Sequence, residues 1–145
     1  MTAQTEPLPS MAALKHQARR LRLVTGRDRM THSRALEAIA HGRGYRDWNT
    51  LSATVRTRMQ GCPVEPGQRV EGRYLGRPFA GTVLRTAPGP ERRLWRVTIA
   101  FDTPVEVAAI EGLNTCRKRV TGVIGPDGRT IDVISDGTPH LRVDA

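Results

Sequence analysis

The feature that most constrains this fold is the segment from Cys62 to Gly67, whose sequence is Cys-Pro-Val-Glu-Pro-Gly. A helix cannot continue through it, because proline lacks a backbone N–H and its ring clashes with the preceding helical turn. Apolar residues recur about every 3.6 residues before this segment and about every 2 residues after it. We therefore predict an α+β fold, with a helical N-terminal part and a β-strand C-terminal part.

Three short helices are expected before the break, each beginning at a capping side chain. The first covers 11–24, the second ends at Gly42, and the third runs from near Asp47 to about Arg58. Serine, threonine and aspartate cap helices because their oxygens accept hydrogen bonds from the unpaired N–H groups of the first turn. The residues expected to mark helix ends are Ser10, Gly26, Thr31 or Ser33, Gly44 and Asp47. The core of this three-helix bundle is expected to contain Leu14, Leu21, Leu36, Ile39, Tyr45, Trp48 and Leu51.

Short alternating strands separated by turns are expected after the break. The clearest strand begins at Trp95 and ends at Phe101, and its alternation assigns both aromatic side chains to the buried side. Turns are expected at 75–78, which closes a hairpin, and at 125–128. The expected strands cover 69–74, 79–85, 95–101, 105–110, 119–124, 131–134 and 140–143. This number of short strands predicts a small antiparallel β barrel or rolled sheet.

The resulting domain plan has four segments, divided where the composition and the periodicity change. They are a disordered N-terminus at 1–10, a helical domain at 11–58, a linker at 59–67 and a small antiparallel β domain at 68–145.

The chain lacks the sequence features of membrane and secreted proteins. No stretch approaches the roughly 20 consecutive apolar residues of a membrane span, and residues 1–10 lack the apolar core of a signal peptide. We therefore expect a cytoplasmic protein without membrane contact, in which Cys62 and Cys116 remain reduced thiols.

Positive charge is concentrated in the helical half. The formal net charge is +9, and all basic residues except Lys15 and Lys118 are arginines. Residues 1–58 hold 11 basic and 4 acidic side chains, whereas residues 59–145 hold 12 and 10. Clustered arginines neutralise phosphates and release counterions, which is the main source of nonspecific nucleic-acid affinity. The charge pattern therefore predicts that the helical half binds DNA or RNA.

The residues assigned to this function lie on the first and third helices and in the loop after the first. Those assigned to phosphate contact are Arg19, Arg20, Arg22, Arg27, Arg29 and Arg46. Base readout is assigned to Arg46, Asn49 and Thr50, because the second and third helices with their glycine-containing turn are similar to a helix-turn-helix motif.

Two other binding modes remain open. The same arginines can serve a regulatory module that binds an acidic protein partner, with Tyr45 and Trp48 as anchors if they are not core residues. The basic run at 117–119 can instead place nucleic-acid binding on the β half.

Three separated motifs, at 14–22, 31–37 and 44–53, read LKHQARRLR, THSRALE and GYRDWNTLSA. Together they resemble the bacterial glyoxalase-related protein domain, over about residues 13–55. In that family the segment stands alone or beside a metal-dependent glyoxalase or dioxygenase module. The second half, with GRYLGRPF at 72–79 and GPDG at 125–128, is similar to the β extension of some standalone members.

The resemblance raises the question of metal chemistry, because glyoxalase modules bind one divalent metal through histidines and glutamates of their strands. The β half has one histidine, His140, and Glu71, Glu106 and Glu111 are spread among arginines. A site of two histidines plus carboxylates cannot be assembled from this half. The sequence also lacks the GxSxG, HExxH, P-loop and GxGxxG motifs. We therefore expect a non-catalytic protein with no cofactor and no metal site, and a metal-dependent glyoxalase-like or dioxygenase-like enzyme is the third hypothesis.

Overall fold

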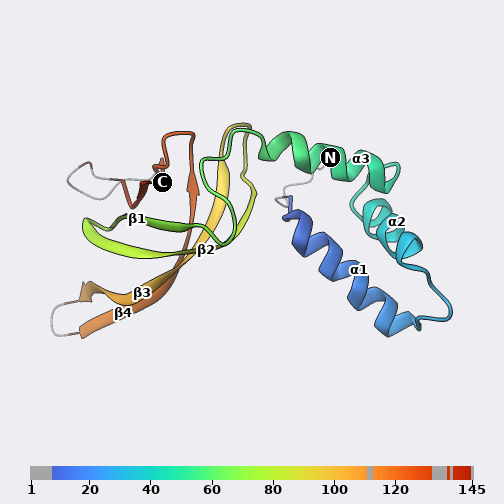
Figure 1. Ribbon diagram of the computed structural model, residues 1–145, viewed down its shortest axis with the longest axis horizontal. Coiled ribbons are helices and arrows are strands. Elements are labelled where there is room, and N and C mark those ends of the chain that lie inside the picture. Colours follow the sequence, from blue (N-terminus) through green and yellow to red (C-terminus); the bar gives the residue numbers. More distant parts are fainter. Residues whose placement is uncertain (1–7, 111–112, 132–136, 138, 145) are drawn as a thin grey trace. The chain divides into compact units, whose positions relative to one another are not determined.

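The chain forms two compact units, Met1–Gln60 and Gly61–Ala145 (Figure 1). The structure is a computed structural model that describes residues 8–110, 113–131, 137 and 139–144. Within these residues the first unit holds three helices and the second holds five strands, which confirms the predicted α+β class. Most of the expected N-terminal segment, residues 1–7, lies outside the described residues.

The helices of the first unit are α1 (Met11–Thr25), α2 (His32–Gly42) and α3 (Trp48–Met59). Each begins at a side-chain cap, as predicted: Ser10 Oγ accepts from Ala13 N at 3.1 Å, and Asp47 Oδ1 accepts from Thr50 N at 2.8 Å. Of the two candidates for α2, Thr31 is the cap, and its Oγ1 accepts from Arg34 N at 3.1 Å. Within the part of the chain that the structure describes, no helix is long and apolar enough to cross a membrane.

The core of the helical unit is smaller than the apolar pattern predicts. Its buried cluster consists of Leu14, Ala40, Leu51 and Val55, with Ile39, Tyr45 and Trp48 packed against it but only partly buried. The expected core residues Leu21 and Leu36 are also only partly buried, whereas Ala18 and Ala35 are fully buried. Alanine leaves little side-chain volume between helices, so the larger residues beside it lie at the edge of the core.

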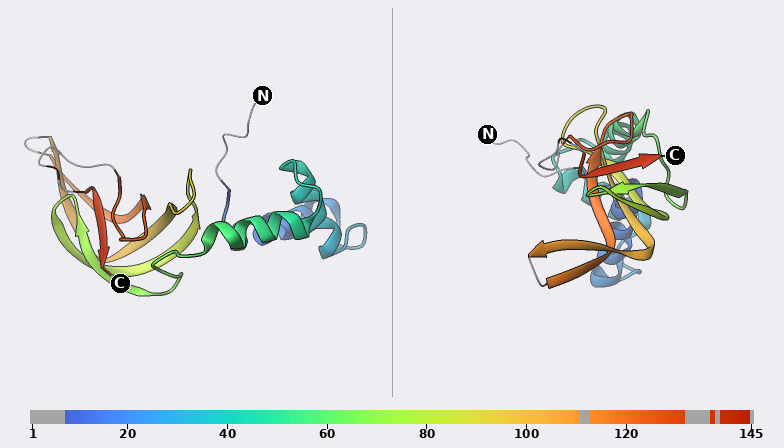
Figure 2. Two further views of the ribbon diagram at one scale, coloured as in Figure 1. Left: turned by 90° about the horizontal axis from the view of Figure 1, so that it is seen from above. Right: turned by 90° about the vertical axis from the view of Figure 1, so that its left-hand side faces the viewer.

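The second unit is an antiparallel sheet with the strand order β4-β3-β2-β1-β5. The sheet curls into a half-barrel (Figures 1 and 2), so a rolled sheet is confirmed. Its strands are β1 (Arg69–Tyr74), β2 (Arg77–Pro88), β3 (Trp95–Ile110), β4 (Leu113–Ile124) and β5 (Leu141–Asp144).

The hairpin between β1 and β2 is tighter than expected. Its turn consists of Leu75 and Gly76, both at positive φ, because Tyr74 already pairs with Arg77. Such two-residue turns match the right-handed twist of the strands that they join. The predicted four-residue turn at 75–78 is therefore wrong, and β2 begins two residues earlier than expected.

Strand β3 replaces two predicted strands, 95–101 and 105–110. Its register against β4 shifts between Ala100, opposite Arg119, and Val105, opposite Arg117. The intervening residues form a bulge that accommodates Pro104, whose missing N–H would break a regular ladder. Strand β4 also begins earlier than predicted, at Leu113. The strand expected at 131–134 lies almost entirely outside the described residues.

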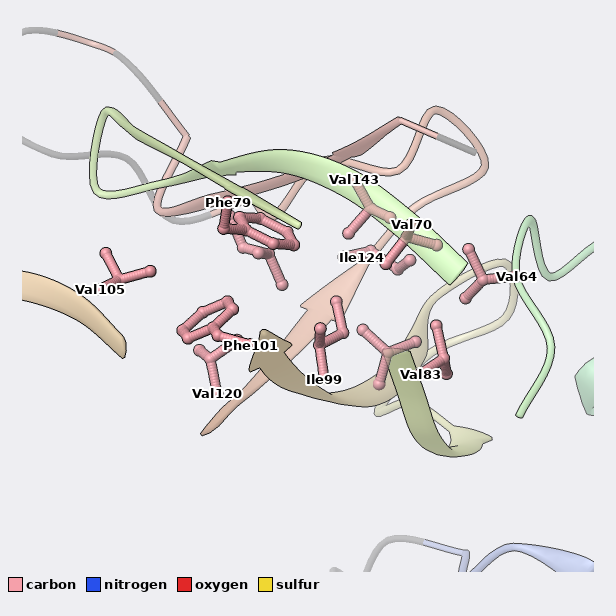
Figure 3. Packing of buried hydrophobic residues seen from close by; sticks show 12 residues of the cluster. Val64, Val70, Phe79, Val83, Ile99, Phe101, Val105, Val120, Ile124 and Val143 are labelled. Atoms are coloured by element: carbon pink, nitrogen blue, oxygen red, sulfur yellow. The ribbon is translucent and has the colours of Figure 1, made fainter. Parts of the chain in front are cut away.

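The concave side of the sheet holds the main apolar cluster (Figure 3). Trp95 and Phe101 are buried as predicted, with 1% and 8% exposed, and the rings of Phe79 and Phe101 lie 4.9 Å apart. Val64, from the proline-containing segment, is buried in the same cluster. The residues around the break therefore pack into the β unit.

A short segment at 128–130 lies between the ends of β4 and β5. Its amides and carbonyls bond to β5, with Val143 N donating to Gly128 O at 2.8 Å and Thr130 N donating to Leu141 O at 3.0 Å. Thr130 also forms a bridge with Ile124, the last residue of β4. The expected turn at 125–128 is present, with Gly128 N donating to Gly125 O. β5 therefore has a backbone partner on both sides, β1 and this segment.

Candidate nucleic-acid interface

Four of the predicted phosphate-contacting arginines lie on one part of the helical unit. Arg19 and Arg20 are exposed on α1, and Arg27 and Arg29 are exposed in the loop that follows it. Among the residues that the structure describes, none of the four forms an ion pair or a side-chain hydrogen bond. Their guanidinium groups are therefore available to an external anion. We call these four residues the α1 arginine cluster.

Arg22 has a different role from its neighbours. It is only partly exposed, and its Nε donates to the carbonyl of Met30 at 3.0 Å. This hydrogen bond holds the loop after α1 against the last turns of the helix. Arg22 therefore positions the loop that carries Arg27 and Arg29, and less of its guanidinium is free for a ligand.

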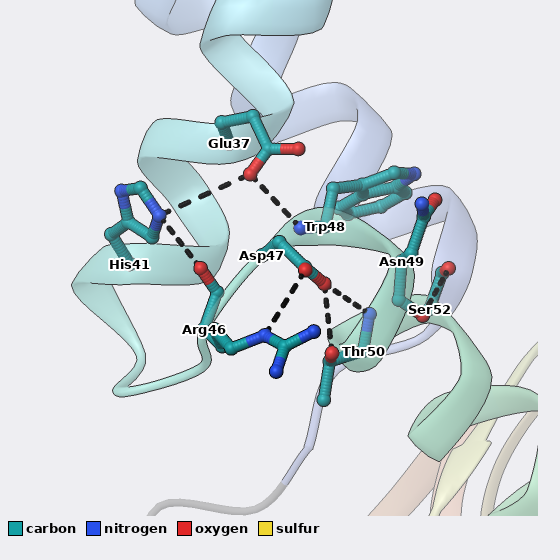
Figure 4. A network of polar contacts seen from close by, with 8 residues as sticks. All are labelled: Glu37, His41, Arg46, Asp47, Trp48, Asn49, Thr50 and Ser52. Carbon is teal, nitrogen blue, oxygen red and sulfur yellow. Dashed lines mark hydrogen bonds and ion pairs between the residues drawn. The ribbon is translucent and has the colours of Figure 1, made fainter.

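The remaining predicted residues, Arg46 and Asn49, lie where α2 connects to α3 (Figure 4). The Arg46 side chain is 88% exposed, and its Nε lies 3.5 Å from Asp47 Oδ2. Asn49 is exposed on the first turn of α3, and its carbonyl accepts a hydrogen bond from Ser52 Oγ. These two residues therefore lie at the start of α3, on a different part of the helical unit from the α1 arginine cluster.

A polar network joins α2 to the start of α3 (Figure 4). Glu37 Oε2 accepts a hydrogen bond from Trp48 N at 3.1 Å, and it lies 3.9 Å from His41 Nε2. The same His41 nitrogen lies 2.9 Å from the carbonyl of Arg46. Glu37 and Trp48 come from two of the sequence motifs, so these motif positions fix the connection between two helices.

Asp47 completes this network as the N-cap of α3. Its Oδ1 accepts hydrogen bonds from both Thr50 N and Thr50 Oγ1, at 2.8 and 2.7 Å. These bonds stabilise the ionised carboxylate and hold the pKa of Asp47 below its ordinary value. Thr50, assigned to base readout, is therefore engaged in the cap.

The β unit contains a groove of about 640 Å³ between the β1–β2 hairpin and the bulge of β3. Three carboxylates from two strands line it: Glu71 of β1, and Asp102 and Glu106 of β3. Asp102 is paired with Arg69 through two hydrogen bonds of 2.7 and 2.5 Å, which lower the pKa of its carboxyl group. Within the described part of the chain, no three metal-ligating side chains lie close enough together to hold a metal ion.

Sequence reasoning missed this grouping of acids, because it depends on sheet pairing. Glu71 and Glu106 are far apart in the sequence. They line the same groove because β2 pairs with β1 on one side and with β3 on the other. The alternation of exposed residues in each strand was the one signal that could have placed them on the outer face.

The basic run at 117–119 lies on β4 and is exposed. Among the described residues, Arg117, Lys118 and Arg119 form no ion pair. The exposed aromatic residues that would stack on bases are absent from the described part of this unit, where Phe79, Trp95 and Phe101 are buried and Tyr74 is partly buried. The run therefore offers charge without a stacking surface.

Comparison with known proteins gives one match. A family model described as "glyoxalase superfamily protein" matches residues 4–145, which include both units and all three motifs of the helical unit. No curated protein matches the chain, and no solved structure matches it. The chain belongs to this family of glyoxalase superfamily proteins.

Proposed function

We propose that this protein is a non-catalytic, cytoplasmic nucleic-acid-binding protein that contacts phosphates through its helical unit. The α1 arginine cluster supplies most of the phosphate contacts. Arg46 and Asn49 supply a second contact point at the start of α3. Arg22 supports the interface by holding the loop that carries two of the arginines.

The distribution of acids carries this proposal. Of the four acids of the helical unit, Glu37 and Asp47 are engaged in the connection between α2 and α3, and Glu6 lies outside the described residues. Asp28 is then the one described acid near the α1 arginine cluster. The positive field over α1 and its loop is thus poorly balanced, which favours an external polyanion.

The dimensions of α1 suit a polyanion. A helix of 15 residues is about 22 Å long, and duplex DNA carries one phosphate charge per about 1.7 Å of its axis. Several phosphates can therefore lie within reach of one exposed helix face and its adjoining loop. Arginine is suited to this contact because its planar fork donates two parallel hydrogen bonds to a phosphate.

One observation favours a second candidate, the binding of an acidic protein partner. Leu23 is 63% exposed and Val24 is 86% exposed, and each lies one helical turn after Arg19 or Arg20. Exposed apolar side chains beside arginines are more typical of a protein interface than of a phosphate contact.

The direct test is binding of a fluorescently labelled random-sequence duplex, followed by anisotropy over a range of salt concentrations, with a single-stranded RNA in parallel. The proposal predicts that log K falls linearly with log salt. No binding to either nucleic acid at about 50 mM salt would refute it.

Two controls separate the other hypotheses. Poly-glutamate is the probe for an acidic partner, and the double variant Leu23→Ser/Val24→Ser should leave duplex binding unchanged while it weakens any poly-glutamate binding. Metal analysis of the purified protein addresses catalysis, and stoichiometric bound metal would contradict a non-catalytic role.

A further inference from the structure

Three arginines lie side by side across the edge of the sheet. Arg142 of β5 pairs with Arg73 of β1 on one side and with Arg129 of the 128–130 segment on the other. All three are exposed. We call them the arginine row.

Pairing places their side chains on one face. Residues directly opposite in an antiparallel ladder point to the same side, with their Cα atoms about 4.5–5.5 Å apart. The hydrogen bonds from Val143 N and Thr130 N flank the pair of Arg129 and Arg142, which is the arrangement with the closer spacing. The three side chains therefore begin within one short span of the surface.

Such an arrangement costs stability, because like charges directly opposite each other repel. Acids offset part of the cost on one side of the row: Asp144 Oδ1 accepts from Arg142 Nε at 3.1 Å, and Glu71 lies opposite Asp144. Arg73 Nη1 donates to the carbonyl of Gly76 at 3.1 Å. These bonds fix two of the guanidinium groups and leave their other N–H groups free to donate.

Two glycines allow the backbone of β5 to lie close to β1 and to the 128–130 segment. Gly72 and Gly128 each precede an arginine of the row, and a Cβ atom added to them would lie 1.9 Å from Arg142 O and 2.3 Å from Val143 O. Any other residue at either position would push β5 away. Glycine is therefore required where β5 meets both of its neighbours.

We propose that the arginine row binds a phosphate group. Three guanidinium groups from β1, β5 and the 128–130 segment supply more N–H donors than one phosphate can accept, and a bound dianion relieves the repulsion among them. The phosphate comes either from a nucleic-acid backbone or from a small phosphorylated molecule. This site lies in the β unit and does not depend on the helical interface proposed above.

The test is thermal unfolding in inorganic phosphate and in chloride at matched ionic strength. The melting temperature of the parent protein should rise with phosphate concentration beyond its value in chloride. Arg129→Gln should lose most of this rise, although it leaves the pair of Arg142 and Asp144 intact. Its melting temperature in chloride should equal or exceed that of the parent, because one repulsion is removed.

Arg92→Gln is the matched control, since Arg92 is an exposed arginine outside the row, and it should keep the full response to phosphate. An equal rise in the parent, Arg129→Gln and Arg92→Gln would overturn the proposal, because it would reflect a general effect of phosphate on protein hydration.

A duplex-binding arm then identifies the source of the phosphate. If Arg129→Gln also lowers the salt slope for duplex binding by about 0.9, the row contacts the nucleic-acid backbone. A slope that stays unchanged while the phosphate response is lost assigns the site to a small phosphorylated molecule. If the parent binds no duplex at all, the function proposed for the helical unit fails, and the phosphate test remains decisive for the row.

Discussion

The helical and β units differ in how they are held together and in how they balance charge. The described part of the helical unit buries a cluster of four residues and begins each helix at a side-chain cap. Among its described residues, the β unit buries a cluster of twelve and buries Trp95 as well. The amount of buried apolar surface sets most of the stabilisation, so the β unit should be the more stable of the two.

The helical unit, which has the smaller core, carries the larger net charge. Residues 1–60 carry a net charge of +7 and residues 61–145 carry +2. In the β unit, acids pair with arginines, as in Arg69 with Asp102 and Arg142 with Asp144. In the helical unit, Glu37 joins α2 to α3 and Asp47 caps α3, and Asp47 also lies 3.5 Å from Arg46 Nε. The unit with the smaller core thus carries the unbalanced surface, as expected if that surface serves binding more than stability.

The largest expected effect comes from the two tryptophans. Trp95→Ala should reduce the free energy of unfolding of the β unit by about 3–5 kcal/mol, because its side chain is fully buried. Trp48→Ala should cost less, about 1–3 kcal/mol, because Trp48 is only partly buried. Urea unfolding followed by circular dichroism measures both. Equal losses would show that the two cores do not differ as described.

A smaller effect should follow from removing a cap. Thr31→Ala should cost about 1 kcal/mol, because Arg34 N loses its acceptor at the start of α2. Ser33→Ala is the matched control, because Ser33 lies two residues further along, in the first turn of α2, and does not make this bond. It should change stability by less than about 0.5 kcal/mol. Thermal melts of the two variants compare these losses. A larger loss of stability for Ser33→Ala would show that Ser33, and not Thr31, caps α2.

The two carboxyl groups with lowered pKa values, Asp47 and Asp102, should respond differently to salt. Both carboxyl pKa values lie below the ordinary value of 3.8, so each group stabilises the fold above that pH and loses its contribution as pH falls through the folded pKa. High salt or Arg69→Gln should raise the pKa of Asp102 toward its ordinary value, because the partner is a charge. The pKa of Asp47 should change little, since Thr50 supplies short-range hydrogen bonds. Carboxyl titration by NMR measures both, and equal responses to salt would contradict this difference.

Local signals explain why the helices could be predicted closely. Ser10, Gly26 and Asp47 act within one helical turn, so their effect can be inferred from neighbouring residues. The strands depend on partners far along the chain. Two separate strands, 95–101 and 105–110, are predicted from the sequence, but a bulge opposite β4 carries β3 through Pro104.

The same distinction applies to the candidate sites. Exposure of Arg19 and Arg20 follows from the apolar stripe on the other side of α1. The bond from Arg22 to Met30 O depends on a loop that folds back on the helix. The arginine row depends on β5 pairing with two segments distant in the sequence, and no periodicity within one segment can indicate it.

The most direct test of the division between the units compares two triple variants in duplex binding. Arg19→Gln/Arg20→Gln/Arg27→Gln removes three members of the α1 arginine cluster, and Gln preserves helix propensity in α1. Arg117→Gln/Lys118→Gln/Arg119→Gln removes the same charge from β4. If the helical unit is the binding surface, the first variant lowers the salt slope by roughly 2–3 at an unchanged melting temperature, while the second changes it by less than about 1. Loss of binding in the β4 variant, with no change in the α1 variant, would place the interface on the β unit and contradict the proposed function.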